Sequence, residues 1–119
     1  MERVQFITYR GKRILLVDLT HTKPEEALAV LAEAKKVIGA QPPQSILNLT
    51  DVSHLRYDVA VAQALKKLAV FNKPFVRASA VVGISGLMKI ILDGVERFSD
   101  RRFELFSSRE QAQEWLVQQ

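Results

Sequence analysis

Apolar residues alternate with polar ones, or follow one another almost without interruption, in five short segments of the chain. Such patterns, bounded by turn residues, predict β-strands. The predicted strands are residues 4–9, 13–19, 46–49, 76–82 and 103–106. The fourth strand is nearly continuous in apolar and small residues, and a glycine-containing turn over 83–86 follows it. We therefore place this strand inside the sheet, with helices covering both of its faces.

Apolar residues recur at intervals of three and four in four other segments, which predicts amphipathic helices. Capping boxes at 22–25 and 107–110 mark the starts of the first and last helices, and the second begins near Asp58. The third opens at Gly86 or Leu87. The residues expected to face inward are Ala27, Leu31, Ala34 and Ile38 in the first helix, Val61, Leu65 and Leu68 in the second, Leu87, Ile91, Val95 and Phe98 in the third, and Ala112, Trp115 and Leu116 in the last.

The resulting element order is ββαβαβαβα. The Arg10-Gly11-Lys12 turn joins the first two strands into an antiparallel hairpin, and strand–helix alternation after it predicts parallel pairing. The fold class is therefore α/β, with a mixed, mostly parallel five-stranded sheet, an antiparallel first strand and four helices. No linker or repeat interrupts the chain, so we expect residues 1–119 to form a single domain.

Composition and charge narrow the classes of function. The chain has no cysteine, which excludes disulfides and cysteine-based metal or redox sites. Residues 1–59 hold eight basic and seven acidic residues and residues 60–119 hold nine and six, so the net charge of +4 is not clustered. A nucleic-acid surface would show a basic patch, and a membrane span would need about 20 apolar residues. We expect a cytoplasmic protein that neither binds nucleic acid nor inserts into a membrane.

Three stretches resemble a family of small bacterial domains. They are Leu47–Val52, the Asn72-Lys73-Pro74 turn with Ala80–Gly83, and the closing segment Ser108–Leu116. Together with the leading hairpin, they are similar to the SpoIIAA-like group, which is related to STAS domains of anti-sigma-factor antagonists and to CRAL-TRIO lipid-binding domains. The resemblance spans nearly the whole chain. It implies a STAS-like fold and a regulatory or ligand-binding role.

One departure from that family concerns its phosphorylation switch. Anti-sigma-factor antagonists carry Asp-Ser-Ser-Gly at the start of the second helix, and its first serine is phosphorylated. The matching stretch here is Arg56-Tyr57-Asp58-Val59, which has no serine or threonine. We therefore expect no such phosphorylation switch at this position, and we expect Asp58 to act as a helix N-cap.

Polar residues gather where the parallel strands end. Ser53, His54, Gly83, Ser85 and Gly86 form a candidate crevice for a small anionic ligand at the start of the third helix. The alternative for the two glycines is structural, because glycine lets a strand turn sharply into a packed helix. We favour this structural role over anion binding.

The same edge offers a weaker enzymatic interpretation. Ser85 would be a nucleophile, His54 or His21 its base, and Asp18 or Asp51 the residue that orients the imidazole. The sequence Gly83–Leu87 lacks the G-x-S-x-G pattern of a nucleophile elbow. No histidine or carboxylate spacing indicates a metal site. We therefore expect no enzyme activity, no metal and no cofactor, with a small Ser/His hydrolase as the least favoured alternative.

The third helix is more apolar than one buried face requires. Met88 and Leu92 are four residues apart and form a second stripe beside the predicted sheet-facing one. We expect this stripe to be a homodimer or partner interface, or the mouth of a pocket for an amphipathic ligand. The alternative is that a neighbouring helix packs on it.

The functional hypothesis is a non-enzymatic regulatory or sensor module that docks a protein partner, a second copy or a small ligand. The alternative is a protein that binds a lipid or another amphipathic molecule. An apolar pocket beneath the third helix would favour the alternative, whereas a closed core with a flat apolar surface would favour protein docking.

Overall fold

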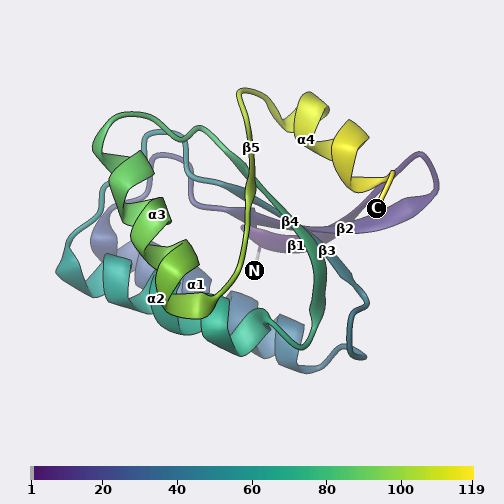
Figure 1. Cartoon of the computed structure of the whole chain (residues 1–119), viewed down its shortest axis with the longest axis horizontal. Coiled ribbons are helices and arrows are strands. Elements are labelled where there is room, and N and C mark those ends of the chain that lie inside the picture. The colour runs from purple at the N-terminus through teal and green to yellow at the C-terminus, as the bar shows by residue number, and fades with distance from the viewer. Residues whose placement is uncertain (1) are drawn as a thin grey trace.

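The computed structural model describes residues 2–119 and contains five strands and four helices in the predicted order (Figure 1). The elements are β1 (Val4–Tyr9), β2 (Lys12–Asp18), α1 (Pro24–Gly39), β3 (Ile46–Asp51), α2 (Val59–Asn72), β4 (Val76–Val82), α3 (Leu87–Ser99), β5 (Glu104–Phe106) and α4 (Arg109–Leu116). The predicted fold class is confirmed.

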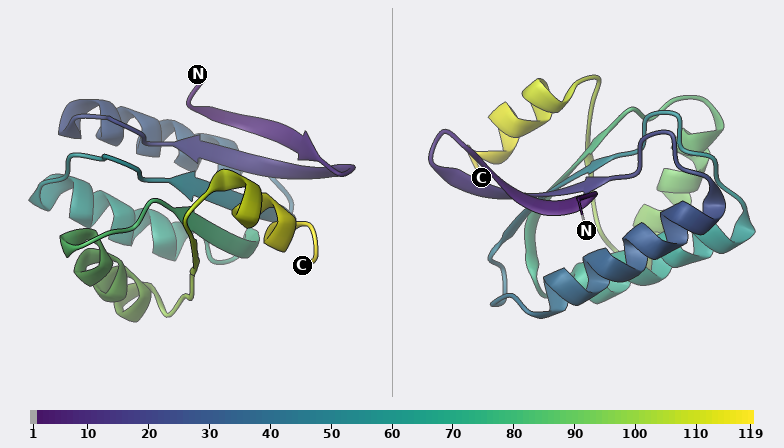
Figure 2. Two further views of the ribbon diagram at one scale, coloured as in Figure 1. Left: turned by 90° about the horizontal axis from the view of Figure 1, so that it is seen from above. Right: turned by 180° about the vertical axis from the view of Figure 1, so that it is seen from behind.

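The strands lie side by side in chain order, β1-β2-β3-β4-β5. β1 is antiparallel to β2, and the remaining pairs are parallel. β4 lies between β3 and β5, which confirms its predicted interior position. Each crossover moves the chain one strand further in the same direction. Because crossovers share one hand, α1, α2 and α3 all lie on one face of the sheet, and α4 covers the other (Figure 2).

Alternate residues of the inner strands face two separate cores. Val81 belongs to the core beneath α1, α2 and α3, whereas Ala80 and Val82 belong to the core beneath α4. Leu116 of α4 is fully buried in that second core. Coverage on both faces is the reason that β4 is apolar along most of its length.

The observed helix N-termini agree only in part with those predicted from the sequence. Asp58 caps α2, since its Oδ1 accepts the Val61 backbone N–H at 2.9 Å. The predicted boxes at 22–25 and 107–110 are each wrong by one residue. The Thr22 hydroxyl donates to a carbonyl, and Glu26 instead accepts from the Lys23 N–H. Ser108 is the N-cap of α4.

The inward face of α3 also differs from the prediction. Leu87 and Phe98 are 60% and 61% exposed, whereas Met88 and Leu92 are each 7% exposed. Val95 is buried as predicted. Apolar residues occupy more than half of the helix circumference, so spacing alone does not fix which flank faces inward.

Met88 and Leu92 are therefore interior residues, and the prediction that they form a surface interface is wrong. The exposed apolar positions of α3 are Leu87, Ile90 and Phe98. α3 packs mainly against α2 rather than against the sheet. The inward side chains of α3 consequently point into the space between α2 and the strands.

Charged residues at the two inward positions should unfold the protein. We expect Met88→Lys with Leu92→Glu to lower the free energy of unfolding by more than about 5 kcal/mol, because two buried side chains are lost and two charges are buried. The matched control is Leu87→Lys with Ile90→Glu on the exposed flank, which should change it by less than about 1 kcal/mol. Urea denaturation measures both. Equal losses in the two variants would contradict this orientation of α3.

Candidate functional site

The structure brings together four of the five predicted crevice residues. Ser53, His54, Gly83 and Ser85 line a surface hollow of about 420 Å³ at the carboxyl ends of β3 and β4. Gly86 is the N-cap of α3 and is not among the lining residues. Anion binding in this hollow stays a prediction.

Gly83 has a structural reason to be glycine. Its φ is +88°, and a Cβ atom there would overlap Ser53 Oγ and lie 2.7 Å from the Ser53 backbone nitrogen. The loop after β3 therefore approaches the loop after β4 too closely for any side chain. This close approach supports the structural interpretation of the glycine turn.

The two histidines stack instead of facing Ser85. The rings of His21 and His54 are 4.6 Å apart between centroids and are inclined by 19°. The His21 N–H donates to the Ser53 carbonyl at 3.1 Å, which ties the loop after β2 to the loop after β3. Among residues 2–119, no hydrogen bond joins Ser85 to either histidine.

The candidate orienting carboxylates are engaged elsewhere. Arg109 Nε donates to Asp51 Oδ2 at 2.6 Å, and Arg109 Nη2 lies 3.4 Å from Asp18 Oδ1. Partial burial acts to raise the pKa of Asp18. Hydrogen bonds from Thr20 and the charges of Arg109 and Arg3 outweigh it, so that pKa lies below its ordinary value. These carboxylates pair with Arg109 at the start of α4, and in the described part of the chain neither imidazole has an acidic partner.

The strand order explains why this edge holds only an open hollow. In open α/β sheets, a ligand crevice forms where the strand order reverses and successive helices move to opposite faces. Here the order never reverses among the described strands. The crossover helices α1, α2 and α3 consequently lie side by side on one face, and among residues 2–119 no crevice opens between crossover helices on opposite faces.

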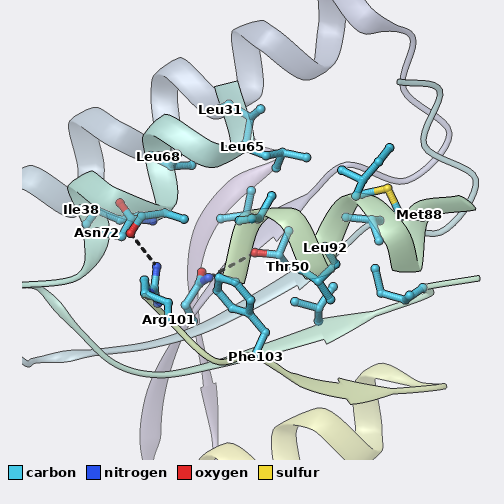
Figure 3. A pocket seen from close by; sticks show the side chains of 18 residues that line it. Leu31, Ile38, Thr50, Leu65, Leu68, Asn72, Met88, Leu92, Arg101 and Phe103 are labelled. Carbon is cyan, nitrogen blue, oxygen red and sulfur yellow. Dashed lines mark hydrogen bonds between the residues drawn. The ribbon is translucent and has the colours of Figure 1, made fainter. Parts of the chain in front are cut away.

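A second space lies inside the molecule, between the sheet, α2 and α3 (Figure 3). Its volume is about 70 Å³, and its walls are mostly aliphatic. Leu65 and Leu68 contribute from α2, and Met88 and Leu92 from α3. A space of this size holds roughly five to seven water-sized groups, which corresponds to a short alkyl chain. We call it the internal cavity.

One end of the internal cavity is polar. Asn48 and Asn72 are 7% and 4% exposed, and within residues 2–119 the Oδ1 atom of each has no hydrogen-bond partner. Arg101 reaches the same end and donates to the Ala69 carbonyl at 3.2 Å and to Ser79 Oγ at 2.6 Å. Asn48 pairs in register with Ser79, which places its side chain beside that guanidinium.

The site residues predicted from the sequence do not include Asn48, Asn72 or Arg101. Asn48 interrupts the buried strand Ile46–Asp51, and a polar residue in an apolar strand was an available signal. Asn72 ends one helical segment and Arg101 follows another, where polar residues are ordinary, so nothing distinguished them.

Gly83→Ala should destabilise the protein by about 3 kcal/mol or more, because a Cβ at a positive φ adds strain and also overlaps Ser53. Gly11→Ala, in the turn between β1 and β2, is the matched control. Its φ is +82° and its Cβ would meet no atom within 4 Å, so we expect about 1 kcal/mol from strain alone. Thermal and urea unfolding measure the difference. Equal losses would show that the close approach to Ser53 does not matter.

Asp18→Asn should alter the acid side of the stability profile. The lowered pKa of Asp18 stabilises the fold above the unfolded-state pKa of about 4, and this contribution is lost as the pH falls through the folded-state pKa. The variant should therefore be less stable than the wild type at pH 6, with the gap shrinking below about pH 4. Urea denaturation across pH tests this, with Asp100→Asn as the exposed control. A gap that stays constant down to pH 3 would contradict it.

Comparisons with known proteins bear on the fold. No family model and no curated protein matches the chain. Among solved structures, an uncharacterized protein from the DUF3478 family of Shewanella loihica PV-4, described as having a SpoIIAA-like fold, is 16% identical to the chain. The match covers 95% of this chain and 91% of that one, with a TM-score of 0.72. No helix within residues 2–119 is long and apolar enough to cross a membrane. The chain thus has the SpoIIAA-like fold that its sequence predicts.

Proposed function

We propose that this protein is a non-enzymatic regulatory or sensor module that binds a small amphipathic molecule in the internal cavity. The observation that supports this most is the pair of unpartnered amide oxygens, Asn48 Oδ1 and Asn72 Oδ1, at one end of an otherwise apolar space. The molecule would place its apolar part among Leu65, Met88 and Leu92 and its polar group at that end.

The energetic argument rests on the cost of unpaired polar atoms. A buried acceptor without a donor costs about 1–3 kcal/mol, so a core selected for stability alone would replace it with an apolar group. A ligand that donates to Asn48 or Asn72 recovers that cost on binding. The apolar lining then adds roughly 0.8 kcal/mol for each CH₂ group removed from water.

The carboxyl edge supports a non-enzymatic role. Asp18 and Asp51 are paired with Arg109, and the histidine rings stack on each other. An acyl-transfer site would instead need a serine, an imidazole and a carboxylate joined by successive hydrogen bonds.

Protein docking is a second candidate, and the exposed flank of α3 favours it. Leu87, Ile90 and Phe98 leave apolar side chains in contact with solvent over the length of this helix. A second copy or a partner protein would cover them. This surface is distinct from the internal cavity, so the two roles are compatible in one sensor.

Binding is tested by titrating butan-1-ol and sodium butanoate into protein with ¹³C-labelled methyl groups. We expect the Met88 and Leu92 methyl resonances to shift with at least one of the two. Leu65→Trp should abolish those shifts by filling the cavity from α2, at a stability cost of about 1–3 kcal/mol. Val59→Trp is the control, because Val59 lies on the same helix and is 74% exposed. Wild-type methyl groups that do not respond to either compound would contradict the proposal.

Native mass spectrometry of freshly purified protein gives an independent reading. A retained small molecule would appear as added mass in the wild type and be absent from Leu65→Trp. The same spectrum reports the oligomeric state, which separates ligand binding from self-association through α3.

A further inference from the structure

Arg101 enters the core immediately after α3 ends. Asp100, the C-cap, is left-handed with φ +53°, and the Arg101 N–H donates back to the Glu96 carbonyl at 3.2 Å. This turn brings the Arg101 side chain beside Asn72, at the end of α2 (Figure 3). Its guanidinium then binds the neutral oxygens of Ala69 and Ser79.

The charge of Arg101 has no acidic partner in the part of the chain that the structure describes. The neighbouring carboxylates are engaged elsewhere: Asp100 pairs with Lys73 at 3.1 Å, and Glu96 accepts the Phe103 N–H at 2.9 Å. Among the residues that line the internal cavity, Arg101 alone is charged. Largely buried charges are normally paired, so this one is available to an anion.

Arg101 also has donors to spare. A guanidinium carries five N–H groups, and two of them serve Ala69 and Ser79. Burial lowers the pKa of Arg101 to about 10, which leaves the group protonated at neutral pH. Phe103 lies 5.0 Å from the guanidinium and closes that side of the cavity with an aromatic ring.

We propose that the cavity ligand is a short-chain hydroxycarboxylate whose carboxylate pairs with Arg101 and whose hydroxyl donates to Asn48 or Asn72. The proposal rests on the function proposed above and names the class of ligand. Asn72 lies one helical turn after Ala69, and Asn48 lies beside Ser79, so both amide oxygens flank the groups that hold Arg101.

The charges and the volume limit the ligand further. A single guanidinium balances a single negative charge, so a carboxylate fits this end better than a dianionic phosphate ester. A carboxylate alone would leave the amide oxygens without a donor, and an alcohol alone would leave Arg101 unpaired. A space of about 70 Å³ accommodates a short alkyl tail and not a long-chain lipid.

The test compares three four-carbon probes: 2-hydroxybutanoate, butanoate and butan-1-ol, titrated into the wild type with the Met88 and Leu92 methyl resonances as the readout. We expect butanoate to bind at least about tenfold more tightly than butan-1-ol, as a charge-assisted hydrogen bond requires. The 2-hydroxy compound should bind severalfold more tightly again.

Arg101→Met should remove the advantage of butanoate over butan-1-ol while butan-1-ol still shifts the cavity methyl groups. Arg102→Met is the matched control, since the neighbouring Arg102 is exposed, does not line the cavity, and carries the same charge. Arg101→Lys keeps the charge and should retain part of the preference, which preserves the test if the methionine variant does not fold.

Two results would overturn the inference. If butan-1-ol binds the wild type as tightly as both acids, the ligand class is wrong although the cavity still binds amphipathic molecules. If Arg102→Met weakens the binding of butanoate as much as Arg101→Met does, the effect is one of net charge and Arg101 does not contact the ligand. An absence of methyl shifts with every probe would reject the proposed function itself.

Discussion

The short last strand limits how much of the sheet lies beneath α3. β5 spans three residues and pairs only with Ala80, Val81 and Val82 of β4. α3 therefore has little sheet to rest on and packs mainly against α2. Two features of the molecule follow from this position: the internal cavity between α3 and the strands, and the exposure of Leu87, Ile90 and Phe98 on the outer flank of the helix.

The sequence predicted the elements that depend on local signals. β1 and β4 have the predicted bounds, and Asp58 caps α2 as expected, because alternation and capping act over a few residues. The inward flank of α3 was not predictable from spacing. Its apolar residues surround most of the helix, and only the tertiary position of α2 selects Met88 and Leu92 over Leu87.

The candidate site, too, was predictable from the sequence only in part. Chain order and strand polarity predicted that Ser53, His54, Gly83 and Ser85 would meet at one edge. An apolar pocket beneath the third helix was one of the alternatives that the sequence left open, but its polar end could not be predicted, because it joins β3, the end of α2 and the turn after α3. Those segments are distant in sequence, and their proximity results from long-range packing. Buried polar atoms without hydrogen-bond partners lower the free energy of unfolding. A ligand that hydrogen-bonds to them would raise it again.

The most direct measurement is a crystal structure of the protein with 4-bromobutanoate, whose bromine is located by its anomalous scattering. We expect the bromine beside Met88 and Leu92 and the carboxylate within hydrogen-bond distance of Arg101. Bromine sites confined to the outer flank of α3, near Leu87 and Ile90, would contradict the central claim. An internal cavity that the surrounding side chains fill completely would contradict it as well.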